Sequence, residues 1–369
     1  MASEMDQTIA RLTPLTELLA IIDAQVKPVA PRNVDLDSAF GTTLAADVTA
    51  PLRPKTPIAI LDGWALAAET TIGAGGYSPV LLPAVPSRVD VGQPMPPGTN
   101  CVARLDAVTI APGRAEVLDP VNPGDGVLPA GGDSDGDLPL RRKGDAVRLL
   151  DLAVLRAAGV TEVSALAARI ALLPLRDDAI VLDIVQFLGG DMAGTALPEL
   201  SDHSCDLATA LGMERVDAVV AVGGTGQGRN DRSVTTLASK GRVVAHGIAL
   251  LPGETAAFGF AGAKPVLLLP GRLDAALAVW LTVGRHMLGR LAGGTPRDPA
   301  KTVTLSRKVA STVGLAEVVP LRLSGELAEP LASKYLSFTA LARSDGWLLV
   351  PADSEGYAAG AQVEMWRWL

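Results

Sequence analysis

A glycine-rich stretch near the middle of the chain has the composition of a phosphate-binding loop. In DAVVAVGGTGQGRNDRS, residues 217–233, an apolar run ends and is followed by Gly223, Gly224, Thr225, Gly226 and Gly228. Glycines let main-chain N–H groups approach an anion closely, and a helix that follows adds the positive end of its dipole. The run SVTTLASKG is a candidate for that helix. We therefore interpret the loop as a phosphate site, and a glycine-rich turn that binds nothing is the alternative.

The loop matches neither of the two common nucleotide-binding patterns. Counted from Gly224, the dinucleotide pattern G-x-G-x-x-G requires a glycine where Arg229 stands. The P-loop pattern requires a lysine followed by serine or threonine, and residues 217–233 contain no lysine. A Rossmann-type oxidoreductase is therefore disfavoured.

Asp231 is the residue of this stretch whose side chain could take part in chemistry. A carboxylate beside an anion repels it unless a cation mediates or arginines offset the charge, and Arg229 and Arg232 flank Asp231. Mg²⁺ prefers oxygen ligands, so Asp231 is a candidate metal ligand for chemistry on a phosphorylated molecule. The alternative is structural, because an aspartate before RSVTTL would cap a helix whatever the function.

Three further turns carry carboxylates. Asp62 lies in LDGWA, Asp133 begins the cluster DSDGD, and Asp178 ends the pair in LRDDA. Each of these turns alone is typical of a solvated surface. The histidines have no metal-ligand spacing and are interpreted as surface or packing residues: His203, His246 and His286. No Ser/His/Asp or Cys/His site is indicated.

The elements that would position these residues alternate over residues 168–298. RIALLPL, DAVVAVGG and KPVLLLPG are apolar runs of strand length, and DLATALGME, SVTTLASKG and LDAALAVWLTVGRHMLGRL have helical patterns. Such alternation predicts a largely parallel sheet flanked by helices. In sheets of this kind, ligands bind beyond the carboxyl ends of the strands, which is where the glycine loop falls.

The flanking segments have other patterns. Residues 13–27 predict an amphipathic helix with Thr13 as its cap and Pro14 in its first turn. Residues 48–141 consist of short apolar pieces separated by proline and glycine, which predicts a small β module, and a short helix is expected over residues 149–159. AEVVPLRLSG, GWLLVPA and AQVEMWRWL predict β structure again toward the end of the chain.

Composition excludes several classes of protein. The chain has 369 residues, enough for more than one domain, and 32 Lys+Arg against 40 Asp+Glu give a net charge of −8. Nucleic-acid binding is therefore not expected. Cys101 and Cys205 are far apart, which argues against a disulfide framework or structural zinc and favours the cytoplasm. We expect no secretory signal, because MASEMDQTIAR carries acidic residues before any apolar run. We expect no membrane association, because the most apolar region is interrupted by Pro270, Arg272 and Asp274.

A series of motifs resembles, in order, those of the MoeA family, the molybdopterin molybdenumtransferases that include the gephyrin E domain. LDGWA stands where the family has D-G-Y-A, VGQPMPPGTNCV where it has T-G-A-P-x-P-x-G-x-D-x-V, and GGDSDGDLPLRRKGD where it has G-E-D-I. VGGTGQGRNDRS stands for S-G-G-V-S-x-G-x-x-D-Y, LLPGETAAFG for K-P-G-K-P-x-x-F-G, and LLLPGRLDAAL for L-P-G-N-P-x-S. The resemblance covers nearly the whole chain.

This resemblance implies an elongated α/β and β multidomain architecture. Its parts would be a linking domain (28–47 and 142–167), a β module (48–141), an α/β molybdopterin-binding domain with a parallel sheet (8–27 and 168–298) and a C-terminal β domain (299–369). The implied activity is insertion of molybdate into molybdopterin or its adenylylated form, with Mg²⁺ participating. The implied assembly is a homodimer with the cleft between protomers, and a molybdoenzyme or another cofactor-synthesis protein is an implied partner.

The same motifs mark individual residues. The resemblance implies catalytic carboxylates at Asp62, Asp133, Asp178 and Asp231, with Asp231 also the metal ligand. It adds to the glycine loop a second set of ligand-binding residues: Pro252, Gly253, Pro270, Gly271 and Arg272.

Several positions depart from the family pattern. The two lysines of K-P-G-K-P are replaced by Leu251 and Glu254, which reverses the charge where molybdate should be attracted. The serines of S-G-G-V-S are replaced by Val222 and Gly226. Because oxyanion chemistry relies on preorganised cations and N–H donors, the alternative is a catalytically degenerate relative that binds molybdopterin or a partner without inserting metal. Three arginines could compensate: Arg229, Arg232 and Arg272.

Overall fold

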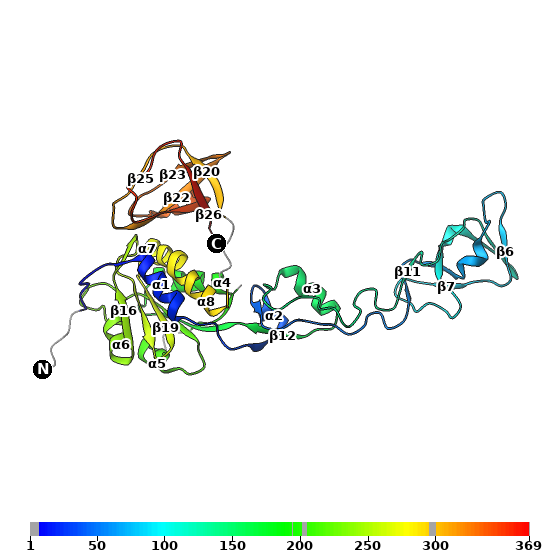
Figure 1. Ribbon diagram of the computed structural model, residues 1–369, viewed down its shortest axis with the longest axis horizontal. Helices are drawn as coiled ribbons and strands as arrows, with labels where there is room; N and C mark the ends of the chain where they lie inside the picture. The colour runs from blue at the N-terminus through cyan, green and yellow to red at the C-terminus, as the bar shows by residue number, and fades with distance from the viewer. Residues whose placement is uncertain (1–6, 194, 201–204, 295–299, 369) are drawn as a thin grey trace. The chain divides into compact units, whose positions relative to one another are not determined.

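The computed structural model describes residues 7–193, 195–200, 205–294 and 300–368, and Figure 1 labels its elements. The chain divides into two compact units. Unit 1 comprises residues 1–45, 144–149 and 162–369, and unit 2 comprises residues 46–143 and 150–161. The fold is multidomain, with a mixed α/β part and a C-terminal β part in unit 1. The finer four-part division expected from the sequence stays a prediction.

A six-stranded sheet forms the α/β part of unit 1. Its spatial order is β14 (Ala196–Leu200), β13 (Ala168–Pro174), β15 (Ala218–Val222), β19 (Lys264–Leu269), β18 (Ala257–Ala261) and β16 (Arg242–His246). The first four strands are parallel to one another. β18 pairs with β19 in antiparallel orientation, and β16 pairs with β18 in the same way. The expected alternation of strands and helices is confirmed, and the sheet is mixed rather than wholly parallel.

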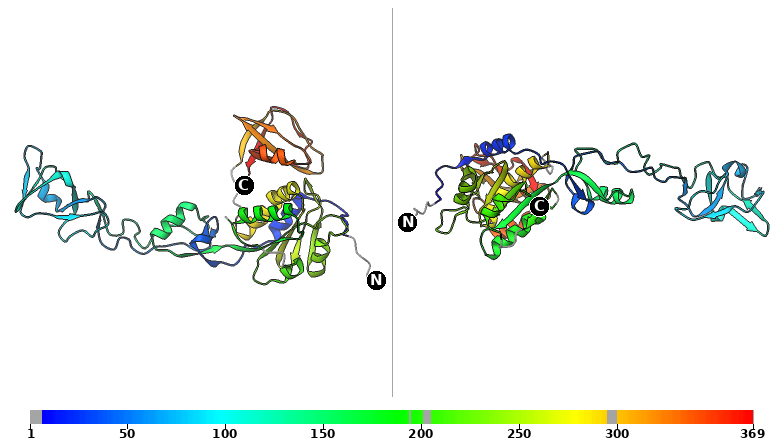
Figure 2. Two further views of the ribbon diagram at one scale, coloured as in Figure 1. Left: turned by 180° about the vertical axis from the view of Figure 1, so that it is seen from behind. Right: turned by 90° about the horizontal axis from the view of Figure 1, so that it is seen from below.

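Helices cover both faces of this sheet because successive strand residues point into two different cores. Leu172 and Val220 pack in one core, and Leu173 and Val219 pack in the other. The first face carries α1 (Leu15–Gln25), α4 (Ala179–Met192), α7 (Leu273–Val279) and α8 (Arg285–Leu291), and the second carries α5 (Leu207–Gly212) and α6 (Ser233–Lys240). A π-helical turn, Trp280–Gly284, joins α7 to α8. Figure 2 shows α1, in dark blue, beside α8, in yellow.

The C-terminal part of unit 1 is a small sheet that closes on itself. Its strands follow the order β22 (Ala316–Ser324), β23 (Leu327–Pro330), β20 (Lys301–Leu305), β26 (Gln362–Arg367) and β24 (Gly346–Val350), and β24 pairs back with β22. β17 (Ile248–Leu251) and β1 (Thr13–Pro14) extend it beside β22. Smaller elements are β21 (Val309–Ala310), β25 (Gly356–Tyr357) and α9 (Phe338–Arg343). Strands β22, β24 and β26 confirm the β structure expected from the three apolar runs.

The first helix begins later than the sequence pattern predicts. Thr13 and Pro14 form strand β1, which pairs with β17, and the N–H of Thr13 donates to the carbonyl oxygen of Gly247 at 2.9 Å. α1 therefore starts at Leu15, and its N-cap position is occupied by Pro14 without a side-chain hydrogen bond. The prediction that Thr13 caps this helix was wrong because its backbone is used in the sheet.

Unit 2 consists mainly of short antiparallel strands. One group is β7 (Ser87–Val89), β5 (Gly63–Leu66) and β8 (Cys101–Arg104), a second is β6 (Val80–Leu82), β10 (Arg114–Val117) and β9 (Val108–Ala111), and a third is β11 (Val127–Leu128) with β4 (Ile58–Ala59). The 3₁₀ turns Ala68–Thr71 and Leu105–Ala107 lie between them. α3 (Leu149–Ala157) is the short helix expected after this segment.

Unit 1 also contains a separate three-stranded sheet. Its strands follow the order β2 (Arg32–Asp35), β12 (Glu162–Leu166) and β3 (Thr43–Leu44), and α2 (Leu36–Ala39) packs beside it. Across the described ranges of the chain, the structure contains no helix with the length and apolar character needed to cross a bilayer.

Candidate functional site

A cavity of about 700 Å³ opens where three neighbouring parallel strands end. Arg176 and Asp178 follow β13, residues 224–226 follow β15, and residues 270–272 follow β19, and all of them line this cavity. Asp231 and Thr255 contribute to the same wall. The structure thus gathers most of the sequence-predicted site residues of unit 1 at the carboxyl edge of the sheet, the usual position for a ligand in this architecture.

The turn of the glycine loop depends on its first two glycines. Gly223 has a φ of +106° and Gly224 a φ of +67°, conformations that side-chain-bearing residues rarely adopt. The N–H of Gly223 donates to the carbonyl oxygen of Leu269 at 2.8 Å, which ties the loop to the end of β19. Gly226 does not have a positive φ, so its backbone conformation does not require glycine. A Cβ at Gly226 would lie 2.7 Å from Oδ2 of Asp231.

The carbonyl oxygens of residues 224–226 are held by donors that do not line the cavity. Ser233 Oγ donates to the oxygen of Gly224 at 2.6 Å. His246 Nε2 lies 3.1 Å from the oxygen of Thr225, and because a carbonyl can only accept, Nε2 carries the proton. Gln7 Nε2 donates to the oxygens of Gly224 and Gly226 at 2.8 and 2.6 Å.

This anchoring determines where the N–H groups of the loop point. In a planar trans peptide the N–H is directed opposite to the preceding carbonyl. Because the carbonyls of residues 224–226 are turned toward Gln7, His246 and Ser233, the N–H groups of residues 225–227 face the other way. Among the described residues these three N–H groups have no hydrogen-bond acceptor. Thr225 and Gly226 line the cavity and Gln227 follows them, and N–H donors fixed in such a position are what an oxyanion requires.

Two arginines face this cavity, and each is held by an aspartate two residues later. Arg176 Nε lies 3.2 Å from Oδ2 of Asp178, and Arg272 Nη2 lies 2.6 Å from Oδ2 of Asp274. The pKa of Arg272 is raised, first by its hydrogen bond to Asp274 and further by the negative charges of Asp274 and Glu254. The guanidinium of Arg272 also lies over the ring of Tyr335, 5.1 Å from its centroid. Both arginine side chains line the cavity, where their guanidinium groups can bind an anionic ligand.

The carboxylates expected in this part of the chain are engaged in local structure. Asp178 is the N-cap of α4 and accepts the N–H of Val181 at 3.0 Å. Asp231 Oδ2 accepts the N–H of Gly228 at 3.0 Å. Asp231 is not the N-cap of α6, as the structural alternative supposed: Arg232 occupies that position, without a side-chain capping bond. That alternative was wrong by one residue.

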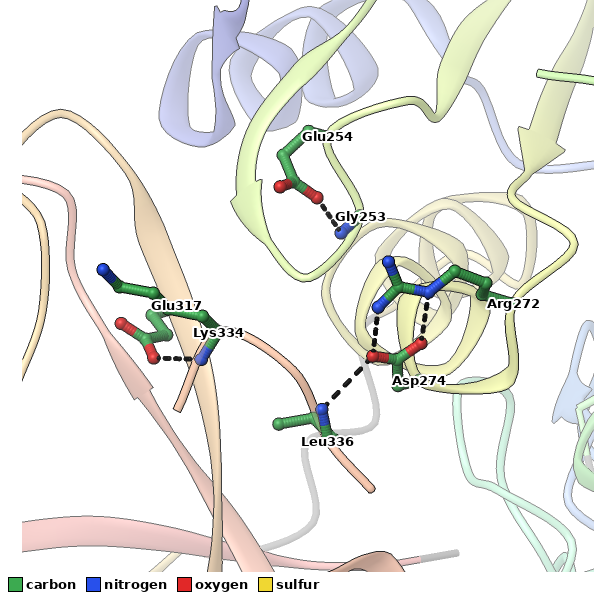
Figure 3. A network of polar contacts seen from close by, with 7 residues as sticks. All are labelled: Gly253, Glu254, Arg272, Asp274, Glu317, Lys334 and Leu336. Atoms are coloured by element: carbon green, nitrogen blue, oxygen red, sulfur yellow. Dashed lines mark hydrogen bonds and ion pairs between the residues drawn. The ribbon is translucent and has the colours of Figure 1, made fainter. Parts of the chain in front are cut away.

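The second predicted loop reaches the cavity through a residue that the sequence reasoning did not mark. Pro252 and Gly253 are buried and do not line the cavity, whereas Thr255 does, with its hydroxyl 3.3 Å from that of Thr225. Gly253 has a φ of +137°, and its N–H donates to the carboxylate of Glu254 at 2.9 Å (Figure 3). Pro252 and Gly253 therefore shape the turn that presents Thr255.

Asp62 and Asp133 belong to unit 2 and are not among the residues that line this cavity of unit 1. Oδ1 of Asp62 accepts the N–H of Val91 at 2.7 Å, and the N–H of Asp133 donates to the carbonyl oxygen of Arg53 at 2.9 Å. Both side chains are exposed. Their proposed catalytic role stays a prediction.

Sequence reasoning missed several residues that build the site: Gln7, Arg176, Thr255, His246 and Tyr335. Arg176 could have been found, because Arg-x-Asp follows both β13 and β19 in the sequence. His246 was interpreted as a surface or packing residue; it is half-buried and does not line the cavity, but its hydrogen bond to the glycine loop was not expected. His203 lies outside the described residues.

Three protein-family models match consecutive parts of the chain. The MoeA N-terminal region (domain I and II) matches residues 13–159, a probable molybdopterin binding domain matches residues 179–290, and the MoeA C-terminal region (domain IV) matches residues 302–368. The glycine loop and Arg272 both fall within the match to the molybdopterin binding domain.

Similar proteins extend over almost the full chain. Molybdopterin molybdenumtransferase 2 of Mycobacterium tuberculosis is 25% identical over 398 residues, which cover 94% of this chain and 97% of that protein. A protein of Methanocaldococcus jannaschii whose name assigns it to molybdopterin biosynthesis is 25% identical and covers 91% of this chain and 92% of its own length. The crystal structure of the molybdopterin biosynthesis moeA protein from Pyrococcus horikoshii superimposes with a TM-score of 0.69 at 22% identity, covering 97% of this chain and 100% of that one.

Proposed function

Because the chain belongs to the MoeA family and hence to molybdenum cofactor biosynthesis, we propose that it inserts molybdate into molybdopterin or its adenylylated form. The observation that carries this proposal is the glycine loop, in which the N–H groups of residues 225–227 have no acceptor among the described residues and residues 224–226 line a cavity together with two arginines. These donors would bind the phosphate of the molybdopterin ligand.

Arg272 and Arg176 would provide the positive charge for the oxyanion. The positions of the two family lysines are occupied by Leu251 and Glu254, which cannot attract an anion. Arg272 lines the cavity with a side chain that is 60% exposed, so its charge is available to a ligand. Its planar group offers several N–H donors in a fixed arrangement, which suits a tetrahedral oxyanion.

Asp231 would take part in holding Mg²⁺ together with the phosphate of the ligand. It lines the cavity, and Oδ1 has no partner within the described residues, while Oδ2 accepts the N–H of Gly228. No three His, Cys, Asp or Glu side chains come together as a complete metal site in the described ranges. This fits Mg²⁺, which is often held by one or two carboxylates, substrate phosphate oxygens and water. The ion would offset the repulsion between Asp231 and the phosphate.

We extend the proposal to a homodimer in the cytoplasm, on the basis of the family resemblance and the cysteine usage. In this proposal, Asp62 and Asp133 remain candidate catalytic carboxylates. Sedimentation at micromolar concentration should show the dimer, and a monomer at every concentration would contradict this part of the proposal.

The decisive experiment joins complementation to an assay with purified protein. Expression should restore molybdoenzyme activity to a bacterial strain that lacks its own molybdenum-insertion enzyme. The purified chain should convert molybdopterin and molybdate to the metal-containing cofactor in a Mg²⁺-dependent reaction. Binding of molybdopterin without complementation or conversion would favour the degenerate relative instead.

A further inference from the structure

Gln7 is a buried polar residue that connects the start of the chain to the glycine loop. Its side chain makes three hydrogen bonds to main-chain groups more than two hundred residues away, and only 6% of the residue is exposed. Nε2 donates to the oxygens of Gly224 and Gly226, and Oε1 accepts the N–H of Val234 at 3.1 Å. A buried amide with both of its ends engaged in this way holds its partners in one relative orientation.

The bond to Val234 replaces a missing helix cap. α6 begins at Ser233, and Arg232, at its N-cap position, makes no side-chain capping bond. A side-chain oxygen at the N-cap normally accepts the N–H of the second or third helical residue. Val234 is the second residue of α6, so Oε1 of Gln7 performs this role from a distant segment.

The two hydrogen bonds from Gln7 Nε2 to the loop differ in whether another donor also binds the accepting oxygen. The oxygen of Gly224 also accepts from Oγ and N of Ser233, so it keeps donors without Gln7. The oxygen of Gly226 has Gln7 as its one donor among the described residues. The peptide between Gly226 and Gln227 therefore depends on Gln7, and glycine permits this peptide to rotate if the bond is lost.

We propose that Gln7 is a positioning residue for anion binding, which orients the Gly226–Gln227 peptide so that the N–H of Gln227 is directed at the ligand. Gln7 does not line the cavity and would not touch the ligand. Its amide is suited to the role because it both donates and accepts, whereas glutamate only accepts and methionine does neither effectively. In identifying the ligand as the phosphate of molybdopterin, the inference rests on the proposed function.

Inorganic phosphate is the probe that tests this role independently of molybdopterin chemistry. We expect Gln7→Met to weaken phosphate binding about tenfold, and Gln7→Glu to weaken it further because the carboxylate repels both carbonyl oxygens and the anion. Gln25→Met is the matched control, since Gln25 is an exposed residue of α1 that accepts a hydrogen bond from Arg242. It should leave the phosphate affinity unchanged.

A second measurement separates positioning from a general loss of structure. In ¹H–¹⁵N spectra of the full chain, phosphate should shift the amide signals of residues 225–227 in the wild type. In Gln7→Met the shift at Gln227 should be lost while that at Thr225 persists, because the Thr225 peptide keeps its Ser233 bonds. If Gln7→Met does not fold, Gln7→Glu, which keeps the acceptor for Val234, is measured instead.

The outcomes are distinct. Unchanged phosphate affinity and an unchanged Gln227 shift in a folded Gln7 variant would overturn the inference, as would a wild type that binds no phosphate. If phosphate binding depends on Gln7 but complementation fails, the inference stands and the proposed insertion activity fails.

Discussion

Arg272 and Asp274 form an ion pair in which the cation is exposed and the anion is buried. Arg272 Nε and Nη2 lie 3.1 and 2.6 Å from the two carboxylate oxygens, and the side chains are 60% and 4% exposed. The same carboxylate accepts the N–H of Leu336 from the C-terminal part of unit 1 at 3.2 Å (Figure 3). Asp274 therefore fixes Arg272 at the cavity and also joins α7 to the C-terminal segment.

Arg272→Lys should weaken the binding of molybdate and inorganic phosphate about tenfold. Lysine keeps the charge but cannot make two parallel bonds to Asp274, so its ammonium would not be held at the cavity. Titration calorimetry measures this effect. Arg322→Lys, a similar change at an arginine that pairs with Glu329, is the control and should have no effect on affinity. If Arg272→Lys and the wild type bind molybdate and phosphate with equal affinity, the guanidinium of Arg272 does not contribute to anion binding.

Glu317→Gln should lower the free energy of unfolding by about 1–3 kcal/mol. Glu317 is fully buried and accepts from Ser311 Oγ, Ser333 Oγ and the N–H of Lys334. The amide group of glutamine would place N–H donors where a carboxylate oxygen now accepts, so a serine hydroxyl must turn to accept and a charge-assisted hydrogen bond is lost. Urea unfolding tests the prediction, with Glu326→Gln at an exposed position as the control. A loss no larger than that of the control would show that the carboxylate is not needed there.

The sequence predicts the position of the site better than its internal geometry. Strands β13, β15 and β19 each contain a continuous apolar run that leads into a loop, so local pattern is sufficient to place the three loops together. The contacts of Gln7 with Gly224 and Gly226 span 217 and 219 residues, and no local pattern encodes them. Asp231 was expected as a possible helix cap, but the helix begins one residue later than that cap requires, which is within the usual uncertainty of helix ends.

Cys101 should make stability fall at alkaline pH. Burial of its thiol, aided by the charges of Asp125 and Glu69, raises its pKa from the ordinary value of 9.0 to about 11. The folded state favours the neutral thiol, so its contribution is complete below pH 9.0 and is lost as the pH rises to about 11. The difference in melting temperature between the wild type and Cys101→Ala should shrink over that range. A constant difference would contradict the shifted pKa.

Glu254→Gln should strengthen the binding of molybdate and phosphate about fivefold, equivalent to ~1 kcal/mol for a charge near the protein surface. Glutamine retains an acceptor for the N–H of Gly253, so the turn should persist without the negative charge that acts on Arg272. Glu326→Gln changes the net charge equally at an exposed site and serves as the control. If both variants raise the affinity alike, only the overall charge matters.

Gly226→Ala and Asp231→Asn should separate the N–H donors of the loop from the proposed Mg²⁺ site. A Cβ at residue 226 would lie 2.7 Å from Oδ2 of Asp231, so the carboxylate must move and the loop should bind phosphate less tightly with or without Mg²⁺.

Asparagine at 231 keeps an oxygen that can accept the N–H of Gly228, but it is a poorer metal ligand. Removing the charge also removes its repulsion of the anion, so we expect Asp231→Asn to bind phosphate at least as well as the wild type without Mg²⁺ while losing the additional affinity that Mg²⁺ confers. Calorimetric titrations of both variants, with and without Mg²⁺, measure these differences. Undiminished Mg²⁺ dependence in Asp231→Asn would exclude Asp231 as a metal ligand, and unchanged phosphate binding in a folded Gly226→Ala would exclude the loop as the anion site.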